Sequence, residues 1–282
     1  MPHRTLTSDA WYVRAVLPRV TRHFVEVPQG TVHYASAGEG ETVMLLHQTP
    51  RSWDEFRDVL PLLGRRRRAV AMDTAGFGDS SPLPAGSDSI EAWAGVVLAV
   101  LDALSVERAD LVGHHTGAAV AVELAVSAPE RVRSLVLSSS PFADAEVRAA
   151  HLTGRAVVDD VDRLPDGSHL LDLWRTRAAF YPDGDIDLLE RFTVDALKAG
   201  TLAADGHRIV ARYDVPAAVP GIRCPVLLIG ATADPYGYPA FARLRAALPD
   251  AHVEEIEGGM VPLPDQLPEQ FAAAVERFLD RL

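Results

Sequence analysis

Short apolar runs alternate with longer stretches of helical periodicity along most of the chain. The runs contain almost no polar interruption, which is typical of strands that are buried on both faces of a parallel sheet. Each is long enough for a strand and too short for a helix. Strands are therefore predicted at residues 42–46, 69–72, 110–112, 133–137 and 225–229, with a weaker one at 253–256.

The stretches between these runs repeat apolar residues every three to four positions, as a helix packed on a sheet requires. Residues 89–104 carry one such stripe, and residues 271–282 carry another. Near the amino end, residues 23–35 predict a hairpin that turns at Gln29 and Gly30. The order of strands and helices predicts an α/β fold with a mostly parallel central sheet flanked by helices.

One long segment departs from this alternation. Between residues 141 and 221 no buried strand run occurs, and the pattern indicates helices, notably at 168–181 and 185–200. We interpret residues 141–221 as a helical cap inserted into a core formed by residues 1–140 and 222–282. Ligands of open α/β sheets bind beyond the carboxyl ends of the strands, so a cap there would enclose a pocket.

Composition narrows the function classes. The chain has 282 residues and a formal net charge of −12, so phosphate backbones and anionic membrane surfaces are poor partners. The pocket expected under the cap predicts a small-molecule substrate instead. The single cysteine, Cys224, cannot form an internal disulfide. No signal peptide or membrane span is apparent, so a cytoplasmic location is predicted. The pattern gives no indication of oligomeric state.

The polar residues that suggest chemistry follow the predicted strands. The first strand leads into His47-Gln48-Thr49-Pro50, and the second leads into Asp73-Thr74-Ala75-Gly76-Phe77-Gly78-Asp79-Ser80. The third leads into Gly113-His114-His115-Thr116-Gly117, where the two glycines permit a sharp strand-to-helix turn around His115. Later strands end at Asp234 and at Gly258-Gly259-Met260.

The first four of these strand-end motifs, up to Asp234 and in this order, resemble the α/β-hydrolase superfamily from about residue 23 to the end of the chain. The likeness is to the capped branch with epoxide hydrolases, haloalkane dehalogenases and carbon–carbon bond hydrolases. It implies that Thr49-Pro50 forms a turn that is often cis in this branch. It also implies a nucleophile at the elbow, an acid at Asp234 and a base histidine after the last strand.

The chain departs from that pattern at the reacting positions. The elbow centre is His115 instead of Ser, Asp or Cys, Met260 stands in place of the base histidine, and Gln48 replaces the usual glycine. The covalent intermediate of the family is therefore not available. We expect His115 to lean toward Asp234, forming a His-Asp dyad that acts as an oriented general base without a nucleophile.

The resemblance also implies an oxyanion site. It consists of the main-chain N–H of Thr116 and one N–H from the loop of Gln48 and Thr49, which would stabilise a developing negative charge. His47, at the start of this loop, and Met260 are included among the residues expected to bind substrate, Met260 as pocket lining. Gln48 has either an amide that reaches substrate or a structural role in the loop. For His114 and Asp73, packing and structural roles are favoured.

Three functions remain open. The leading hypothesis is a cofactor-free, metal-free enzyme that uses the dyad for elimination, decarboxylation or isomerisation of a carbonyl compound, with a secondary metabolite as one suggestion. An alternative is hydrolysis of an activated ester, lactone or epoxide by water that the dyad activates. The third is a binding protein without catalysis.

Overall fold

A single twisted sheet forms the centre of the computed structural model, which describes residues 17–152 and 158–282. Within these residues the strand order is β1-β2-β4-β3-β5-β6-β7-β8. The β1–β2 hairpin and the β2–β4 pair are antiparallel, and all other pairs are parallel. The strands are Thr21–Val27 (β1), Gly30–Ala37 (β2), Thr42–Leu46 (β3), Arg68–Met72 (β4), Ala109–His114 (β5), Val132–Ser138 (β6), Val226–Ala231 (β7) and His252–Ile256 (β8).

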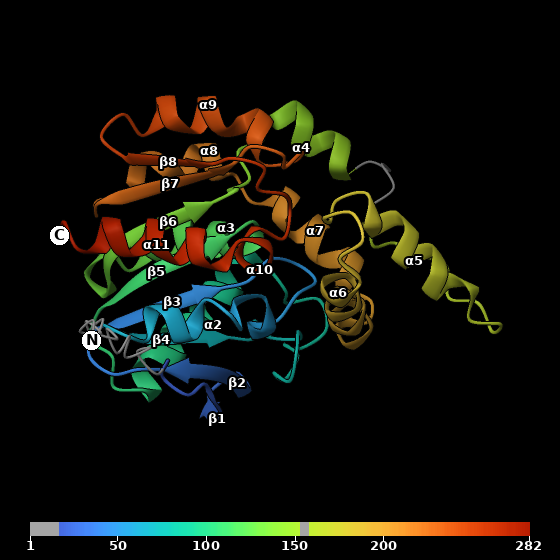
Figure 1. Cartoon of the computed structure of the whole chain (residues 1–282), viewed down its shortest axis with the longest axis horizontal. Coiled ribbons are helices and arrows are strands. Elements are labelled where there is room, and N and C mark those ends of the chain that lie inside the picture. Colours follow the sequence, from blue (N-terminus) through green and yellow to red (C-terminus); the bar gives the residue numbers. More distant parts are fainter. Residues whose placement is uncertain (1–16, 153–157) are drawn as a thin grey trace, which may run out of the picture.

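Helices cover both faces of this sheet (Figure 1). Helices α2 and α3 pack together on one face, whereas α1 and α11 lie against the other. Each face has its own apolar core, and the central strands contribute alternate side chains to the two. The helices of this α/β part are Leu60–Leu63 (α1), Ile90–Ala103 (α2), Thr116–Ser127 (α3), Tyr238–Ala247 (α9), Leu263–Gln266 (α10) and Pro268–Leu279 (α11), with short 3-10 turns at Trp53–Phe56 (η1) and Pro129–Arg131 (η2).

The described residues between β6 and β7 form helices joined by loops and contain no strand. Figure 1 shows α5 and α6 beside the sheet and projecting away from it, with α7 between them and the sheet. The helices of this insertion are Ala145–Leu152 (α4), Ser168–Ala178 (α5), Ile186–Ala199 (α6), Leu202–Arg212 (α7) and Val215–Ala218 (α8), followed by a 3-10 turn at Val219–Gly221 (η3).

A buried charge cluster ties the insertion to the sheet. The guanidinium of Arg51 is fully buried; its Nε donates to Asp195 on α6 at 2.9 Å, and its Nη1 donates to Asp265 on α10. Arg191, also on α6, pairs with Asp265 and with Asp54. Burial raises the pKa of Asp265 to about 6, although Arg51 and Arg191 both favour its charged form. The buried carboxylates have lost their hydration, and the positive charges of these two arginines compensate for that loss.

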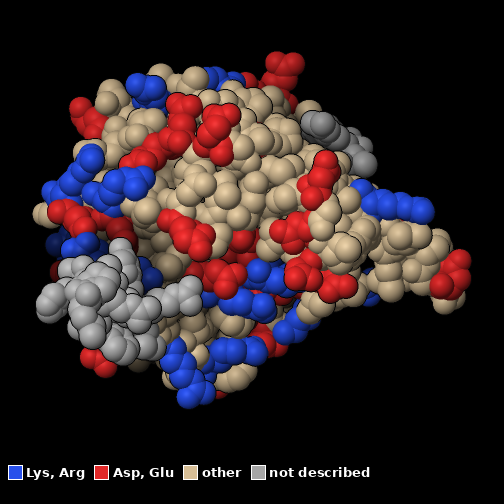
Figure 2. Space-filling view, in the orientation of Figure 1, with Lys and Arg blue, Asp and Glu red and all other residues tan. Residues whose placement is uncertain are grey.

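Elsewhere, acidic and basic side chains are interspersed over the face drawn in Figure 2. Several form exposed pairs, such as Arg66 with Asp280. Exposed pairs of this kind contribute little to stability because water screens both charges. No helix in residues 17–152 and 158–282 is both long enough and apolar enough to cross a bilayer.

Replacement of Arg51 by methionine should lower the free energy of unfolding by about 3–5 kcal/mol, because it leaves Asp195 without its buried cation. Urea denaturation measures this loss. The matched control is Arg66→Met at the exposed pair, which should change stability by less than about 1 kcal/mol. Equal effects in the two variants would contradict the role of the buried cluster.

Candidate active site

The turn between β5 and α3 carries His115 at its apex. His115 has φ +46° and ψ −113°, a backbone conformation that non-glycine residues rarely adopt. Neighbouring glycines make the turn sterically accessible: a Cβ on Gly113 would lie 2.4 Å from the oxygen of Gly117, and one on Gly117 would lie 2.0 Å from that of Leu46. Strained non-glycine residues of this kind occur mainly at functional sites.

The structure brings His115 and Asp234 together. His115 Nε2 lies 2.8 Å from Asp234 Oδ2, and the Asp234 carboxylate is buried while the imidazole is partly exposed. The two atoms lie close together without forming an aligned hydrogen bond, since neither has a partner of hydrogen-bond geometry. Such contacts in ligand-free sites often become aligned only when substrate binds.

Asp234 is fixed by its own main chain. Its Oδ1 accepts hydrogen bonds from the N–H groups of Tyr236 at 2.8 Å and Gly237 at 3.0 Å. Burial alone raises the pKa of Asp234, but the charge of His115 and the hydrogen bond from Gly237 outweigh burial and hold the pKa well below its usual range. An ionised Asp234 favours a proton on the facing nitrogen of His115, Nε2, and leaves Nδ1 as the acceptor.

His115 borders a cavity of about 460 Å³ between the sheet and the insertion. Its walls are largely apolar and include Phe142, Val158, Val210, Val215, Pro239 and Val261. Among the described residues, no Ser, Cys, Asp or Glu side chain lines it, and the hydroxyl groups come from threonine and tyrosine. A cavity of this size fits a small organic molecule.

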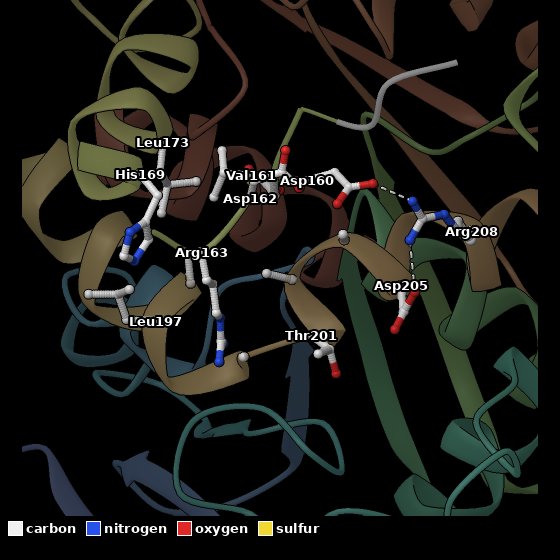
Figure 3. Close-up of a pocket in the computed structure, with 15 residues that line it drawn as sticks. Asp160, Val161, Asp162, Arg163, His169, Leu173, Leu197, Thr201, Asp205 and Arg208 are labelled. Carbon is white, nitrogen blue, oxygen red and sulfur yellow. Dashed lines mark hydrogen bonds and ion pairs between the residues drawn. The ribbon is translucent and has the colours of Figure 1, made fainter. Parts of the chain in front are cut away.

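A larger cavity of about 580 Å³ lies within the insertion, away from His115 and Asp234. Figure 3 shows its mixed wall, in which Arg208 bonds to Asp205 and Asp160 while His169 and Leu173 lie on the opposite side. None of the residues predicted to act in catalysis lines it. Size alone therefore does not identify the candidate active site.

The loop after β3 differs from what the resemblance implied. The Gln48 N–H donates to Glu55 Oε2 at 2.9 Å, and the Thr49 N–H donates to Thr116 Oγ1 at 3.2 Å. The expectation that this loop supplies a free main-chain amide is therefore wrong, because both N–H groups are engaged. Gln48 and Thr49 nevertheless line the cavity, and the peptide bond between Thr49 and Pro50 is cis.

Thr116 retains donors for a developing negative charge. Its main-chain N–H is at the first position of α3, where no intrahelical acceptor exists. Its hydroxyl oxygen accepts from Thr49, so the hydroxyl hydrogen is available to a ligand in the cavity. The side-chain amide of Gln48, by contrast, donates to Glu55 at 2.6 Å and lies 3.4 Å from the Val261 oxygen.

Two other predicted binding residues do not face the cavity. His47 is buried, with Nδ1 2.8 Å from the Gln48 oxygen and Nε2 accepting from the Thr74 N–H at 2.9 Å. Both ring nitrogens are thus used within the fold, and the expected contact of His47 with substrate is wrong. Met260 is absent from the cavity wall, where the next residue, Val261, takes its place. The prediction of Met260 as pocket lining is also wrong.

His114 and Asp73 have structural environments. His114 is buried, with Nδ1 2.9 Å from Ser138 Oγ and Nε2 2.8 Å from the Val261 oxygen. Burial, reinforced by the neighbouring His115, lowers the pKa of His114 to about 3. Asp73 accepts from the main-chain N–H groups of Trp53 and Asp79 and contacts His33. Both fit the packing roles favoured from the sequence.

Sequence reasoning missed three polar residues of the insertion: Arg177, His207 and Asp159. Arg177 and His207 line the cavity beside His115, and Asp159 bonds to both. Helical periodicity alone did not indicate which side of the insertion they occupy. The only signal in the sequence is Gly206, a glycine inside a helical stretch, which can mark a close approach of backbones.

The sequence model of the family described as "alpha/beta hydrolase fold" matches residues 41–183. A 2-hydroxymuconate semialdehyde hydrolase from Pseudomonas sp. (strain CF600) is 39% identical over 37% of this chain and 38% of that protein. A soluble epoxide hydrolase from Corynebacterium sp. (strain C12) is 31% identical over 42% of this chain and 41% of that protein. The chain thus matches less than half the length of these curated relatives.

Solved structures agree on the fold. The enol-lactonase from Burkholderia xenovorans LB400 superposes with a TM-score of 0.76 at 21% identity, covering 92% of this chain and all of that one. At this level of identity the likeness concerns the fold alone. The polar atoms around His115 must therefore carry any argument about chemistry.

Acidification should destabilise the protein through His114. The unfolded ring binds a proton near pH 6.5 and the folded ring only near pH 3, so stability present above pH 6.5 is lost as the pH falls. From pH 6.5 to 4.5 the loss from this group is about 2 kcal/mol. Urea denaturation at several pH values should show a shallower slope for His114→Gln. If the dependence of stability on pH were unchanged in His114→Gln, His114 would not be the group responsible. His252→Gln, at the exposed start of β8, is the control and should leave that dependence unchanged.

Proposed function

The chain belongs to the alpha/beta hydrolase fold family, and from this premise we propose that it hydrolyses a small organic ester, lactone or epoxide with His115 as general base. The observation that carries the proposal is the position of the imidazole at the elbow, 2.8 Å from a buried carboxylate and open to the cavity. The hydrolase relatives support hydrolysis as the reaction class.

His115 supplies the base, and the Asp234 carboxylate faces its Nε2. With the proton of the neutral ring on Nε2, Nδ1 removes a proton from water as the water oxygen attacks the electrophilic carbon. The bond from that carbon to the leaving oxygen then breaks, and a proton is returned to that oxygen. The N–H and hydroxyl of Thr116 stabilise the negative charge that develops on the substrate.

The substrate is small and largely apolar. The aliphatic and aromatic wall of the cavity favours a hydrocarbon portion, and about 460 Å³ accommodates a molecule of modest size. A segment of the polyketide synthase ThaQ from Burkholderia thailandensis is 28% identical over 93% of this chain, which is 13% of that protein. That likeness supports including polyketide-type lactones in a substrate screen. A cytoplasmic location and a secondary-metabolic role are part of the proposal.

Proton removal from carbon is the second candidate. It is favoured by the engaged amides of Gln48 and Thr49, which leave fewer donors for a tetrahedral oxyanion than two free main-chain amides would. The same dyad would then catalyse an elimination, decarboxylation or isomerisation. Turnover in ¹⁸O-labelled water separates the two reactions: hydrolysis places the label in product, whereas isomerisation in D₂O places deuterium on carbon without ¹⁸O.

His115→Ala should lower kcat at least about 100-fold on any ester, lactone or epoxide that the wild type hydrolyses, because the base is lost. Asp234→Asn should lower it at least about tenfold, because its amide donates toward Nε2 and moves the ring proton to Nδ1. Steady-state kinetics and circular dichroism measure activity and folding together.

His252→Ala and Asp250→Asn are matched controls outside the cavity and should retain wild-type kinetics. Full activity in His115→Ala would refute the proposal. Tight binding of a compound that is recovered unchanged would instead favour a binding protein.

A further inference from the structure

A second imidazole backed by a carboxylate faces the same cavity as His115. His207, on α7, lines the cavity, and its Nε2 lies 2.7 Å from Asp159 Oδ2 in a hydrogen bond of good geometry. Its side chain is 30% exposed, whereas that of Asp159 is fully buried. Since a carboxylate oxygen can only accept, Nε2 carries the hydrogen and Nδ1 is the nitrogen left for a ligand.

Asp159 is held as a charged group. Its two oxygens accept from Nε and Nη2 of Arg177, whose guanidinium stacks 4.7 Å from the Phe192 ring centroid. Burial alone would raise the pKa of Asp159, but Arg177 and His207 outweigh burial and lower it to about 2. A fixed carboxylate orients the ring of His207 and stabilises its protonated form.

The backbone brings this ring close to the catalytic loop. A Cβ on Gly206 would lie 2.6 Å from Thr49 Cγ2 and 2.8 Å from Thr49 Oγ1. Only glycine lets α7 approach the loop so closely, which places the next residue, His207, at the cavity wall beside Thr49. Gly206 lies in the interior of α7, where glycine weakens a helix. The close approach accounts for its presence.

We propose that His207 is a second catalytic residue, the general acid that protonates the leaving oxygen while His115 activates water; this inference rests on the proposed function. As water attacks and the bond from carbon to the leaving oxygen breaks, the protonated His207 donates Nδ1–H to that oxygen. The ring is left neutral, with Nε2–H on Asp159. His207 then regains a proton from solvent, and His115 releases one.

The electrostatic environment suits an acid. Burial lowers the pKa of His207, Asp159 offsets part of that shift, and Arg177 and His115 lower the pKa further. The lowered pKa makes the protonated ring a stronger acid than free imidazolium, and a smaller fraction of the ring is protonated at neutral pH. Acid catalysis is needed most when the leaving group is strongly basic, as an alkoxide is, and least for a nitrophenolate.

Two esters of nearly equal size test this role: 4-nitrophenyl hexanoate and 4-nitrobenzyl hexanoate. His207→Phe and His207→Gln should each lower kcat/KM about 100-fold for the nitrobenzyl ester and less than about threefold for the nitrophenyl ester. His115→Ala should reduce the hydrolysis of both esters. Val210→Ala is the matched control, because Val210 also lines the cavity from α7. It should change kcat/KM for the two esters by the same factor.

Each outcome decides between the two proposals. Some His207 variants will keep the wild-type melting temperature. If these lower kcat/KM equally for both esters, or for neither ester, the acid role of His207 is refuted while the proposed function stands. If no hydrolysis of either ester depends on His115, both proposals fail. Asp159→Asn would not isolate the role of His207, because it would also leave the buried Arg177 without its carboxylate.

Discussion

The site depends on one steric constraint, the close packing of three backbones at the turn after β5. Gly113 and Gly117 let β5, α3 and the end of β3 meet with no room for a side chain, so the chain turns through a left-handed residue. The side chain of that residue is directed to the carboxyl edge of the sheet. In this chain it is an imidazole, which reaches the carboxylate that follows β7. The dyad thus follows from the shape of the turn and the length of histidine.

The buried charges hold the insertion over this edge of the sheet. Arg51 and Arg191 join η1 and α10 to α6, while Gly206 allows α7 to pack against Thr49. These contacts enclose a cavity with His115 on the sheet side and His207 on the side of the insertion. A carboxylate lies behind each ring, hydrogen-bonded to His207 and 2.8 Å from Nε2 of His115.

Much of the sheet could be predicted from the sequence because buried strands leave uninterrupted apolar runs. The run at 42–46 coincides with β3, and that at 110–112 lies within the longer β5. The approach of His115 to Asp234 was also expected, because the resemblance to the α/β-hydrolase superfamily places an elbow residue at His115 and an acid at Asp234. The strand positions thus follow from the local pattern, and the two site positions follow from that resemblance.

The remaining details of the site depend on contacts that the sequence pattern does not encode. Glu55 captures the Gln48 amide from seven residues away, a bond that depends on how η1 folds back on the loop. Val261 and not Met260 reaches the cavity, because the turn after β8 decides which of two neighbours points inward. His207 and Arg177 could not be placed, since a helix of the insertion has no sheet to fix its face.

The central claim is that Asp234 sets the tautomer of His115 and leaves Nδ1 free to act as a base. Long-range ¹H–¹⁵N NMR on histidine-labelled protein observes this directly. In the wild type at neutral pH, the neutral His115 ring should carry its hydrogen on Nε2, and Asp234→Asn should transfer it to Nδ1. The account would be contradicted if the neutral His115 ring of the wild type carried its hydrogen on Nδ1. It would also be contradicted if Asp234→Asn left the position of that hydrogen unchanged.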